Sequence, residues 1–252
     1  DTHGPEPTVI VGCFWGHAYQ WRRFETKLRR IQRREGFRIF HAKDFKAHAG
    51  EFKGWDDDRC YRLATDLSNL VGNTLAEGVV IALERQSYLS EYRSVAHPKM
   101  HLDSQLGVCF RSCLVHIIRQ VARMGRKPKL NVVVESGHAN AWDNDRIFHE
   151  IKSRLERRGI FVLEDITIAS KEEAPPLMAA DFLASTYSMI RKHSPEALAA
   201  PTQNDYSNAL VIPHGHRRGL NAIGIEADGL ADFISQAKAF RWERRTDRRR
   251  SS

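Results

Sequence analysis

The chain lacks the features that define several common classes of protein. Only four of its 252 residues are cysteines and no two form a CxxC pair, which argues against disulfides and structural zinc. No apolar run approaches the roughly 20 residues that cross a bilayer, and the first residues do not resemble a secretory signal. The glycine-rich motifs of Rossmann and P-loop folds are absent. We therefore expect a cytoplasmic protein that does not enter membranes and has no standard nucleotide site.

Negative charge is scarce relative to positive charge, and the excess is unevenly placed. The chain has 39 Lys and Arg against 31 Asp and Glu, a net charge of +8. Residues 22–34 hold seven basic side chains against one acid, and residues 241–252 hold six arginines against two acids. Nucleic acid is the commonest soluble partner for such a field, although charge runs often only solvate a helix face or a disordered end. The candidate phosphate-binding residues are Arg22, Arg29, Arg30, Arg33, Arg244 and Arg245.

Apolar runs and helical periodicity alternate along the chain, as expected of an α/β domain with a mixed sheet. The predicted strands lie at residues 8–14, 78–84, 130–135 and 160–168, with a short one beginning at Phe37. The predicted helices lie at residues 18–34, 56–75, 106–121, 142–158, 177–192 and 229–240. The short strand is expected to continue into a polar loop near an active pocket, which ends at Trp55. Residues 85–101 are expected to be irregular.

A carboxylate stands where an apolar strand meets a glycine-containing turn. Residues 132–134 are three successive valines, and Glu135, Ser136 and Gly137 follow them. Three valines fit a strand covered on both faces, and catalytic groups collect at the ends of such strands in open α/β sheets. Glu135 is therefore a candidate catalytic residue, and an exposed acid that merely ends a strand is the alternative.

Asp181 lies among small and apolar residues of the predicted helix at 177–192. A buried charge without a partner is strongly destabilising, and no Lys or Arg stands within one turn of Asp181. Its position is also late for a helix cap. A divalent cation shared with Glu135 would compensate the charge, and carboxylate oxygens suit Mg²⁺ or Mn²⁺. Two such metals, about 4 Å apart, can activate water and stabilise the leaving oxygen in phosphodiester cleavage.

Four short motifs stand in order along the chain. They are DTHGP at residues 1–5, FHAKDF at 40–45, VESG at 134–137 and PLMAADFLA at 176–184. At these residues the chain resembles a bacterial family of RNase H-like domains of unknown function. Members of that family begin with a strand that ends in DESG or DDSG, and they later carry an E-S-G strand end and an A-A-D-L-L helix. The resemblance implies an RNase H-like mixed sheet flanked by helices.

The resemblance also implies roles for individual residues. Glu135 and Asp181 would be metal ligands, with Asp44 and His41 flanking the site. Because histidine exchanges protons near neutral pH, His41 is also a candidate proton shuttle, independently of the resemblance. Asp1 aligns with the leading carboxylate of the family and would be the third metal ligand. The first acidic strand of the family is missing here, so we expect a chain truncated at its start. A histidine that is simply hydrogen-bonded in a loop remains the alternative for His41.

Trp55 is the one tryptophan that stands beside the polar loop. In that position it is a candidate to stack on the bases of a single strand, with burial in the core as the alternative.

The predicted organisation has three parts: an RNase H-like domain at residues 1–193, an extension packed on it at 194–240, and a disordered basic tail at 241–252. The expected function is divalent-metal-dependent hydrolysis of phosphodiester bonds in DNA or RNA. One alternative is a non-catalytic module that binds nucleic acid or a partner on the same scaffold. The other is an inactive fragment.

Overall fold

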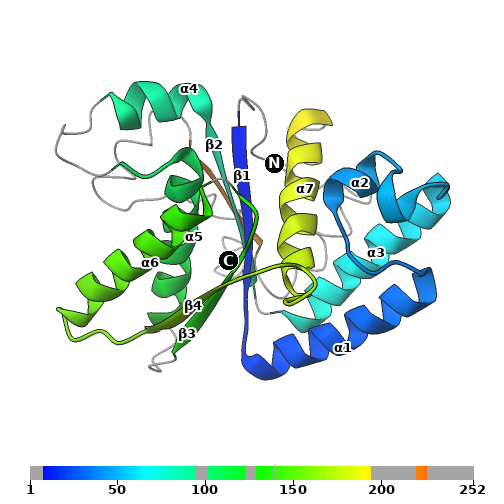
Figure 1. Cartoon of the computed structure of the whole chain (residues 1–252), viewed down its shortest axis with the longest axis horizontal. Coiled ribbons are helices and arrows are strands. Elements are labelled where there is room, and N and C mark those ends of the chain that lie inside the picture. Colours follow the sequence, from blue (N-terminus) through cyan, green and yellow to red (C-terminus); the bar gives the residue numbers. More distant parts are fainter. Residues whose placement is uncertain are drawn as a thin grey trace, which may run out of the picture. The chain divides into compact units, whose positions relative to one another are not determined.

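The computed structural model describes residues 8–75, 77–94, 102–122, 129–138, 140–193 and 220–225. These residues form a mixed α/β structure that divides into two compact units (Figure 1). Unit 1 comprises the described residues within 1–11, 79–167 and 221–252, and unit 2 those within 12–78 and 168–220. None of the helices described is long and apolar enough to span a membrane.

The described strands form two sheets. One sheet has the strand order β1-β2-β5, with β1 at Thr8–Trp15, β2 at Glu77–Glu84 and β5 at Leu220–Ile225. The other pairs β3, at Leu130–Glu135, with β4, at Leu163–Ala169. The four long predicted strands are confirmed, although β4 begins later than expected. Strand β5 was not predicted.

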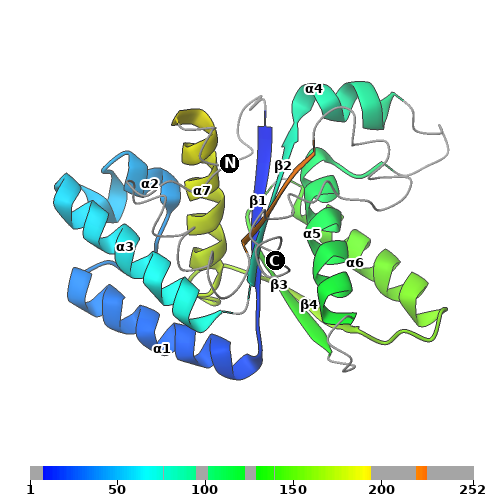
Figure 2. The same ribbon diagram turned by 180° about the vertical axis from the view of Figure 1, so that it is seen from behind.

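Three long helices build unit 2: α1 (Ala18–Glu35), α3 (Asp57–Thr74) and α7 (Leu177–His193). Each confirms a predicted helix at nearly the same bounds. Figure 2 shows α1 alongside α3, as Figure 1 does from the other side. Phe24 and Leu28 are buried, and their spacing places both on one face of α1.

Two helix ends in unit 2 follow from local sequence. The Asp56 side chain accepts a hydrogen bond from the Arg59 amide at 2.7 Å, which caps the start of α3. Gly36 has a φ of +75° and its amide donates to the Gln32 carbonyl at 2.8 Å, which closes the end of α1. The direction in which the chain leaves α1 is therefore set by a glycine.

A cluster of aromatic rings holds the segment between α1 and α3. Phe52 is fully buried at its centre, with ring centroids of Phe45 and Trp55 at 5.2 and 5.1 Å and those of Phe37 and Phe40 at 5.8 Å. The prediction of a strand that begins at Phe37 is wrong. The segment instead folds into two short helices, because its aromatic residues converge on one core. These helices are α2 (Ala42–Lys46) and η1 (Gly50–Phe52).

A glycine in β1 allows α7 to pack closely against this strand. A Cβ atom on Gly12 would lie 2.5 Å from the Ala180 carbonyl oxygen and 3.0 Å from the Ala184 amide nitrogen. Both neighbours are backbone atoms of α7, so no side-chain rotation could make room. Gly12 thus fixes the position of the helix that carries Asp181.

Unit 1 contains two long helices, α5 (Gln105–Ala122) and α6 (Ala141–Glu156), which lie side by side (Figure 1). Both confirm predicted helices. Residues 85–93 were expected to be irregular, and that expectation is wrong. They form a helical turn, α4 (Arg85–Ser87), followed by the π-helix η2 (Tyr88–Arg93).

A buried ionic network joins the helices of unit 1. The exposed fractions of Asp103 and Asp143 are 3% and 0%. Arg111 Nε lies 2.5 Å from Asp103 Oδ2, and Arg146 pairs with both carboxylates. The two guanidinium groups also reach Glu150, at 2.8 and 3.4 Å. Each buried carboxylate therefore has an arginine partner, which compensates its desolvation.

The expected C-terminal parts fall largely outside the described residues. Of the predicted extension at 194–240 only β5 is described, and the helix expected at 229–240 and the tail at 241–252 are not. The same holds for Asp1, Arg244 and Arg245.

Candidate functional site

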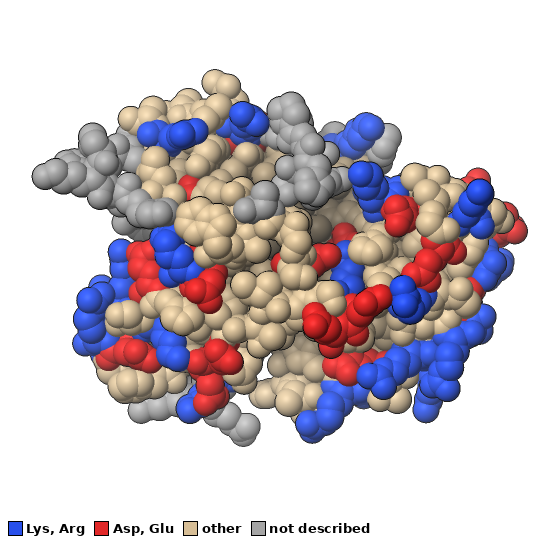
Figure 3. All heavy atoms as spheres, in the orientation of Figure 1, with Lys and Arg blue, Asp and Glu red and all other residues tan. Residues whose placement is uncertain are grey.

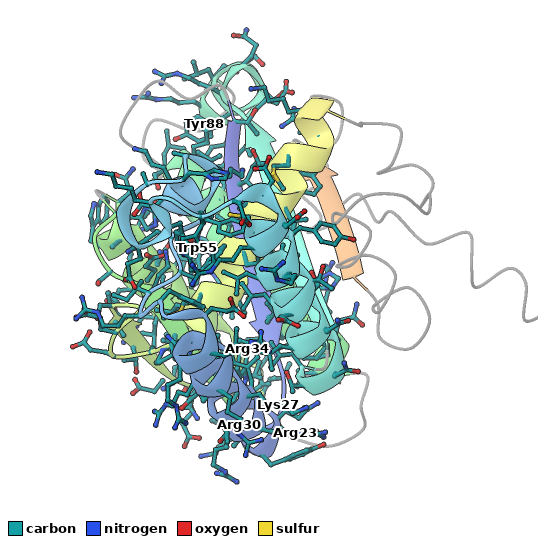
Figure 4. The ribbon with its side chains drawn as sticks, turned by 90° about the vertical axis from the view of Figure 1, so that its right-hand side faces the viewer. Arg23, Lys27, Arg30, Arg34, Trp55 and Tyr88 are labelled. Carbon is teal, nitrogen blue, oxygen red and sulfur yellow. The ribbon has the colours of Figure 1, made fainter. Side chains whose placement is uncertain are left out.

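Helix α1 presents basic side chains along its solvent-exposed surface. Figure 3 shows Lys and Arg side chains gathered over α1, at the lower right of that view. Positions spaced by four, three and four residues fall on one face of a helix. One such row, labelled in Figure 4, comprises Arg23, Lys27, Arg30 and Arg34.

The basic residues of α1 differ in their partners. Arg34 pairs with Glu35 at 2.7 Å and also with Asp66. Arg29 lies 3.8 Å from Glu25, a weak and exposed pair. By contrast, the side chains at the start and middle of the row form no ion pair with any residue that the structure describes. They are Arg23, Lys27 and Arg30. Their charge is available to an outside partner.

Two open hollows in unit 2 adjoin the end of α1. The larger, of about 500 Å³, is lined by Arg29, Gln32, Arg33, Gly36, Phe37 and Arg38. The smaller, of about 250 Å³, shares Gln32 and Arg38 with it and also touches Lys171 and Glu172. Positive charge thus continues from α1 toward the turn that precedes α7.

Asp181 has a basic partner, which corrects the sequence-based expectation. Lys171 Nζ lies 2.7 Å from Asp181 Oδ2, and the lysine side chain is only 5% exposed. The same oxygen accepts a hydrogen bond from the Ala42 amide at 3.1 Å, in the first turn of α2. Lys171 stands ten residues before Asp181 and reaches it across the turn that leads into α7. A salt bridge and a backbone hydrogen bond therefore satisfy this carboxylate.

His41 and Asp44 lie in the same unit as Asp181. His41 is exposed, and its Nδ1 atom lies 3.3 Å from Lys171 Nζ, so the lysine joins the histidine to Asp181. Asp44 is half-buried in α2, and a Cβ atom on Gly50 would lie 2.9 Å from its Oδ2 atom. The structure thus brings His41 into contact with the Lys171–Asp181 pair and directs Asp44 toward η1.

Glu135 ends β3, as predicted, and belongs to unit 1. It is half-buried, and Gly137 follows with a φ of +93°, which suits the turn after the strand. The three valines predicted a strand covered on both faces, and that prediction is wrong. Val133 is 48% exposed, and β3 pairs with β4 alone among the strands described. A metal shared by Glu135 and Asp181 stays a prediction.

The surroundings of Asp181 do not suit a divalent cation as they stand. The buried ammonium of Lys171 already compensates the carboxylate and would repel a second cation beside it. Within the part of the chain that the structure describes, no group of three or more His, Cys, Asp or Glu has the arrangement of a metal site. The Mg²⁺ or Mn²⁺ expectation is therefore not supported by the geometry at Asp181.

Trp55 is not placed to stack on bases. It is 8% exposed within the aromatic cluster, and the Arg59 guanidinium carbon lies 3.7 Å from its ring centroid. Stacking on a base requires an accessible aromatic face. Trp55, labelled in Figure 4, is therefore a core residue, which was the alternative for this tryptophan.

Two residues of the site were not found by sequence reasoning. Neither Lys171 nor Arg38 stands in a sequence motif. Only the folded chain reveals that Lys171 lies beside Asp181 and that Arg38 lies near the end of α1. Comparisons with protein-family models, curated proteins and solved structures found no match.

Proposed function

We propose that the protein binds nucleic acid through the basic surface of α1. The observation that carries this proposal is the row formed by Arg23, Lys27 and Arg30, which have no carboxylate partner among the residues described. From Arg23 to Arg34 the row spans eleven residue-to-residue steps, a helical rise of about 16 Å. One strand of B-DNA advances about 3.4 Å per phosphate, so several phosphates fall within that length. Basic groups so placed bind the backbone and not particular bases.

We further propose an RNase H-like scaffold for this surface. The proposal is supported by the chain order β3, α6, β4, α7, in which Glu135 ends the first strand and Asp181 lies on the last helix. On such a scaffold the protein would act as a nucleic-acid-binding module.

The row can be tested by removing its charge. In Arg23→Gln/Lys27→Gln/Arg30→Gln, the affinity for a single-stranded oligonucleotide is expected to fall about ten- to a hundredfold at low salt, because three phosphate contacts are lost. Fluorescence anisotropy measures this directly.

A matched control separates the row from net charge. The variant Arg154→Gln/Arg157→Gln/Arg158→Gln removes the same charge from the end of α6, where all three residues are exposed. It is expected to bind within about threefold of the wild type. An equal loss in both triple variants would show that total charge, and not α1, governs binding.

Metal-dependent nuclease activity is the second candidate. It is favoured by Glu135, a carboxylate held at a strand end immediately before a glycine turn. The prediction is cleavage of labelled DNA or RNA that requires Mg²⁺ or Mn²⁺ and falls at least a hundredfold in Glu135→Gln. Cleavage that survives this substitution would exclude Glu135 as a metal ligand. If the wild type binds nucleic acid without cleaving it, only the proposal of a binding module stands.

A further inference from the structure

The hollow at the end of α1 is lined by three guanidinium groups and no carboxylate. These belong to Arg29, Arg33 and Arg38. We propose that this hollow binds a phosphate group of a nucleic acid. The inference rests on the proposed function and adds to it a defined phosphate site, distinct from the row of Arg23, Lys27 and Arg30.

The arginines are held in place by the backbone around them. Arg33 Nε donates to the Arg29 carbonyl oxygen at 3.2 Å, which orients the Arg33 side chain. The spacing of four residues places Arg29 and Arg33 on the same face of α1. The Ile39 amide donates to Glu51 Oε1 at 3.0 Å, and the Arg38 amide donates to the same carboxylate. Glu51 thereby fixes the backbone that carries Arg38. The Arg33 side chain and the backbone of Arg38 are consequently held before a ligand arrives, which reduces the entropy lost on binding.

The acids that pair with these arginine side chains are readily displaced. Arg29 lies 3.8 Å from Glu25, and its side chain is 64% exposed. Arg38 Nη2 lies 3.1 Å from Glu172 Oε1, but the two side chains are 78% and 54% exposed. Exposed pairs of this kind contribute little to stability. A phosphate can therefore replace Glu172 as the partner of Arg38 with little loss elsewhere.

Guanidinium groups favour phosphate for geometric reasons. Each offers parallel N–H donors that match two phosphate oxygens, and several together can surround one anion. The Gln32 carbonyl at the end of α1 is already bonded, because the Gly36 and Phe37 amides both donate to it, at 2.8 and 3.2 Å. Arg33 in the last turn also offsets the negative end of the helix dipole. The volume of about 500 Å³ exceeds what a single small anion needs, which suits a phosphate within a chain.

The bound phosphate has two sources in a nucleic acid, the end of a strand or its interior. The variant Arg33→Gln/Arg38→Gln tests both with two oligonucleotides of one sequence, phosphorylated at both ends or at neither. Binding is expected to weaken at least tenfold for the phosphorylated strand. A loss confined to that strand identifies a terminal phosphate, and an equal loss for both strands identifies an internal one.

The outcomes distinguish this inference from the proposed function. If Arg33→Gln/Arg38→Gln binds both oligonucleotides within twofold of the wild type while Arg23→Gln/Lys27→Gln/Arg30→Gln is weakened, the hollow is not a phosphate site and the role of α1 stands. If both variants bind like the wild type, or the wild type binds neither strand, both proposals are wrong. Circular dichroism of each variant confirms that these exposed substitutions leave the fold intact.

Discussion

Replacing Arg146 with Met is expected to lower the free energy of unfolding by about 3–5 kcal/mol, the largest single effect predicted for this chain. Arg146 pairs with Asp103 and Asp143, which are 3% and 0% exposed. Without the guanidinium, Asp143 keeps its buried charge and loses its arginine partner. The remaining carboxylate, and not the missing contact, accounts for most of the loss.

Urea denaturation followed by circular dichroism measures this effect. Arg157→Met, directly after the same helix, is the control, because its side chain is exposed. That variant is expected to change stability by less than about 1 kcal/mol. Equal effects in the two variants would show that the network has no special part in the stability of unit 1.

The same network predicts how stability depends on pH. Burial alone would raise the pKa of Asp143, but a hydrogen bond from the Ser104 amide at 2.6 Å and the pairing with Arg146 outweigh burial and lower it. A lowered pKa in the folded state means that this stability is present above the unfolded value, about 3.9, and is lost as pH falls through the folded value. The wild type is therefore expected to lose stability in acid more steeply than Arg146→Met does.

Lys171→Met is expected to destabilise the protein by about 2–4 kcal/mol, because it leaves the Asp181 carboxylate without its cation. The estimate is lower than for Arg146 since the Asp181 side chain is 24% exposed and water can reach it. Thermal unfolding of Lys171→Met measures the loss, and the exposed Lys53→Met is the control. The double substitution Lys171→Met/Asp181→Leu is expected to recover most of it by removing both charges.

Together with the single variant Asp181→Leu, these two variants form a double-mutant cycle that tests what compensates the Asp181 carboxylate. A coupling free energy of about 2 kcal/mol or more between Lys171 and Asp181 would establish the pair as the reason for the buried carboxylate. If Lys171→Met has no effect, Asp181 is compensated in another way, and a bound cation becomes the better explanation.

The long elements could be predicted from sequence because their signals are local. Helix α1 has apolar residues at helical spacing and a terminal Gly36, and α3 begins with the capping Asp56. The structure of the segment from Phe37 to Trp55 could not be predicted from local signals. It depends on the packing of five aromatic rings from separate turns against one another. Strand β3 was found, but its exposure depends on how many strands pair beside it, which its valines do not encode.

The sequence predicted the positive charge of α1, but it did not predict the salt bridge between Lys171 and Asp181. The basic surface of α1 follows from residues 22–34 alone, because helical spacing places their side chains outward. The partner of Asp181 does not, because Lys171 approaches through a turn and not along the helix. Lys171 stands more than one helical turn from Asp181 in the sequence, so the sequence alone leaves this carboxylate without a partner and favours a metal.

The dependence of oligonucleotide affinity on salt tests α1 as the nucleic-acid-binding surface most directly. Each contact to a single strand contributes about −0.7 to the slope of log affinity against log salt concentration. If Arg23, Lys27 and Arg30 contact phosphates, replacing all three with Gln is expected to make that slope shallower by about 2. Parallel slopes for the wild type and the triple variant would contradict the proposed role of α1.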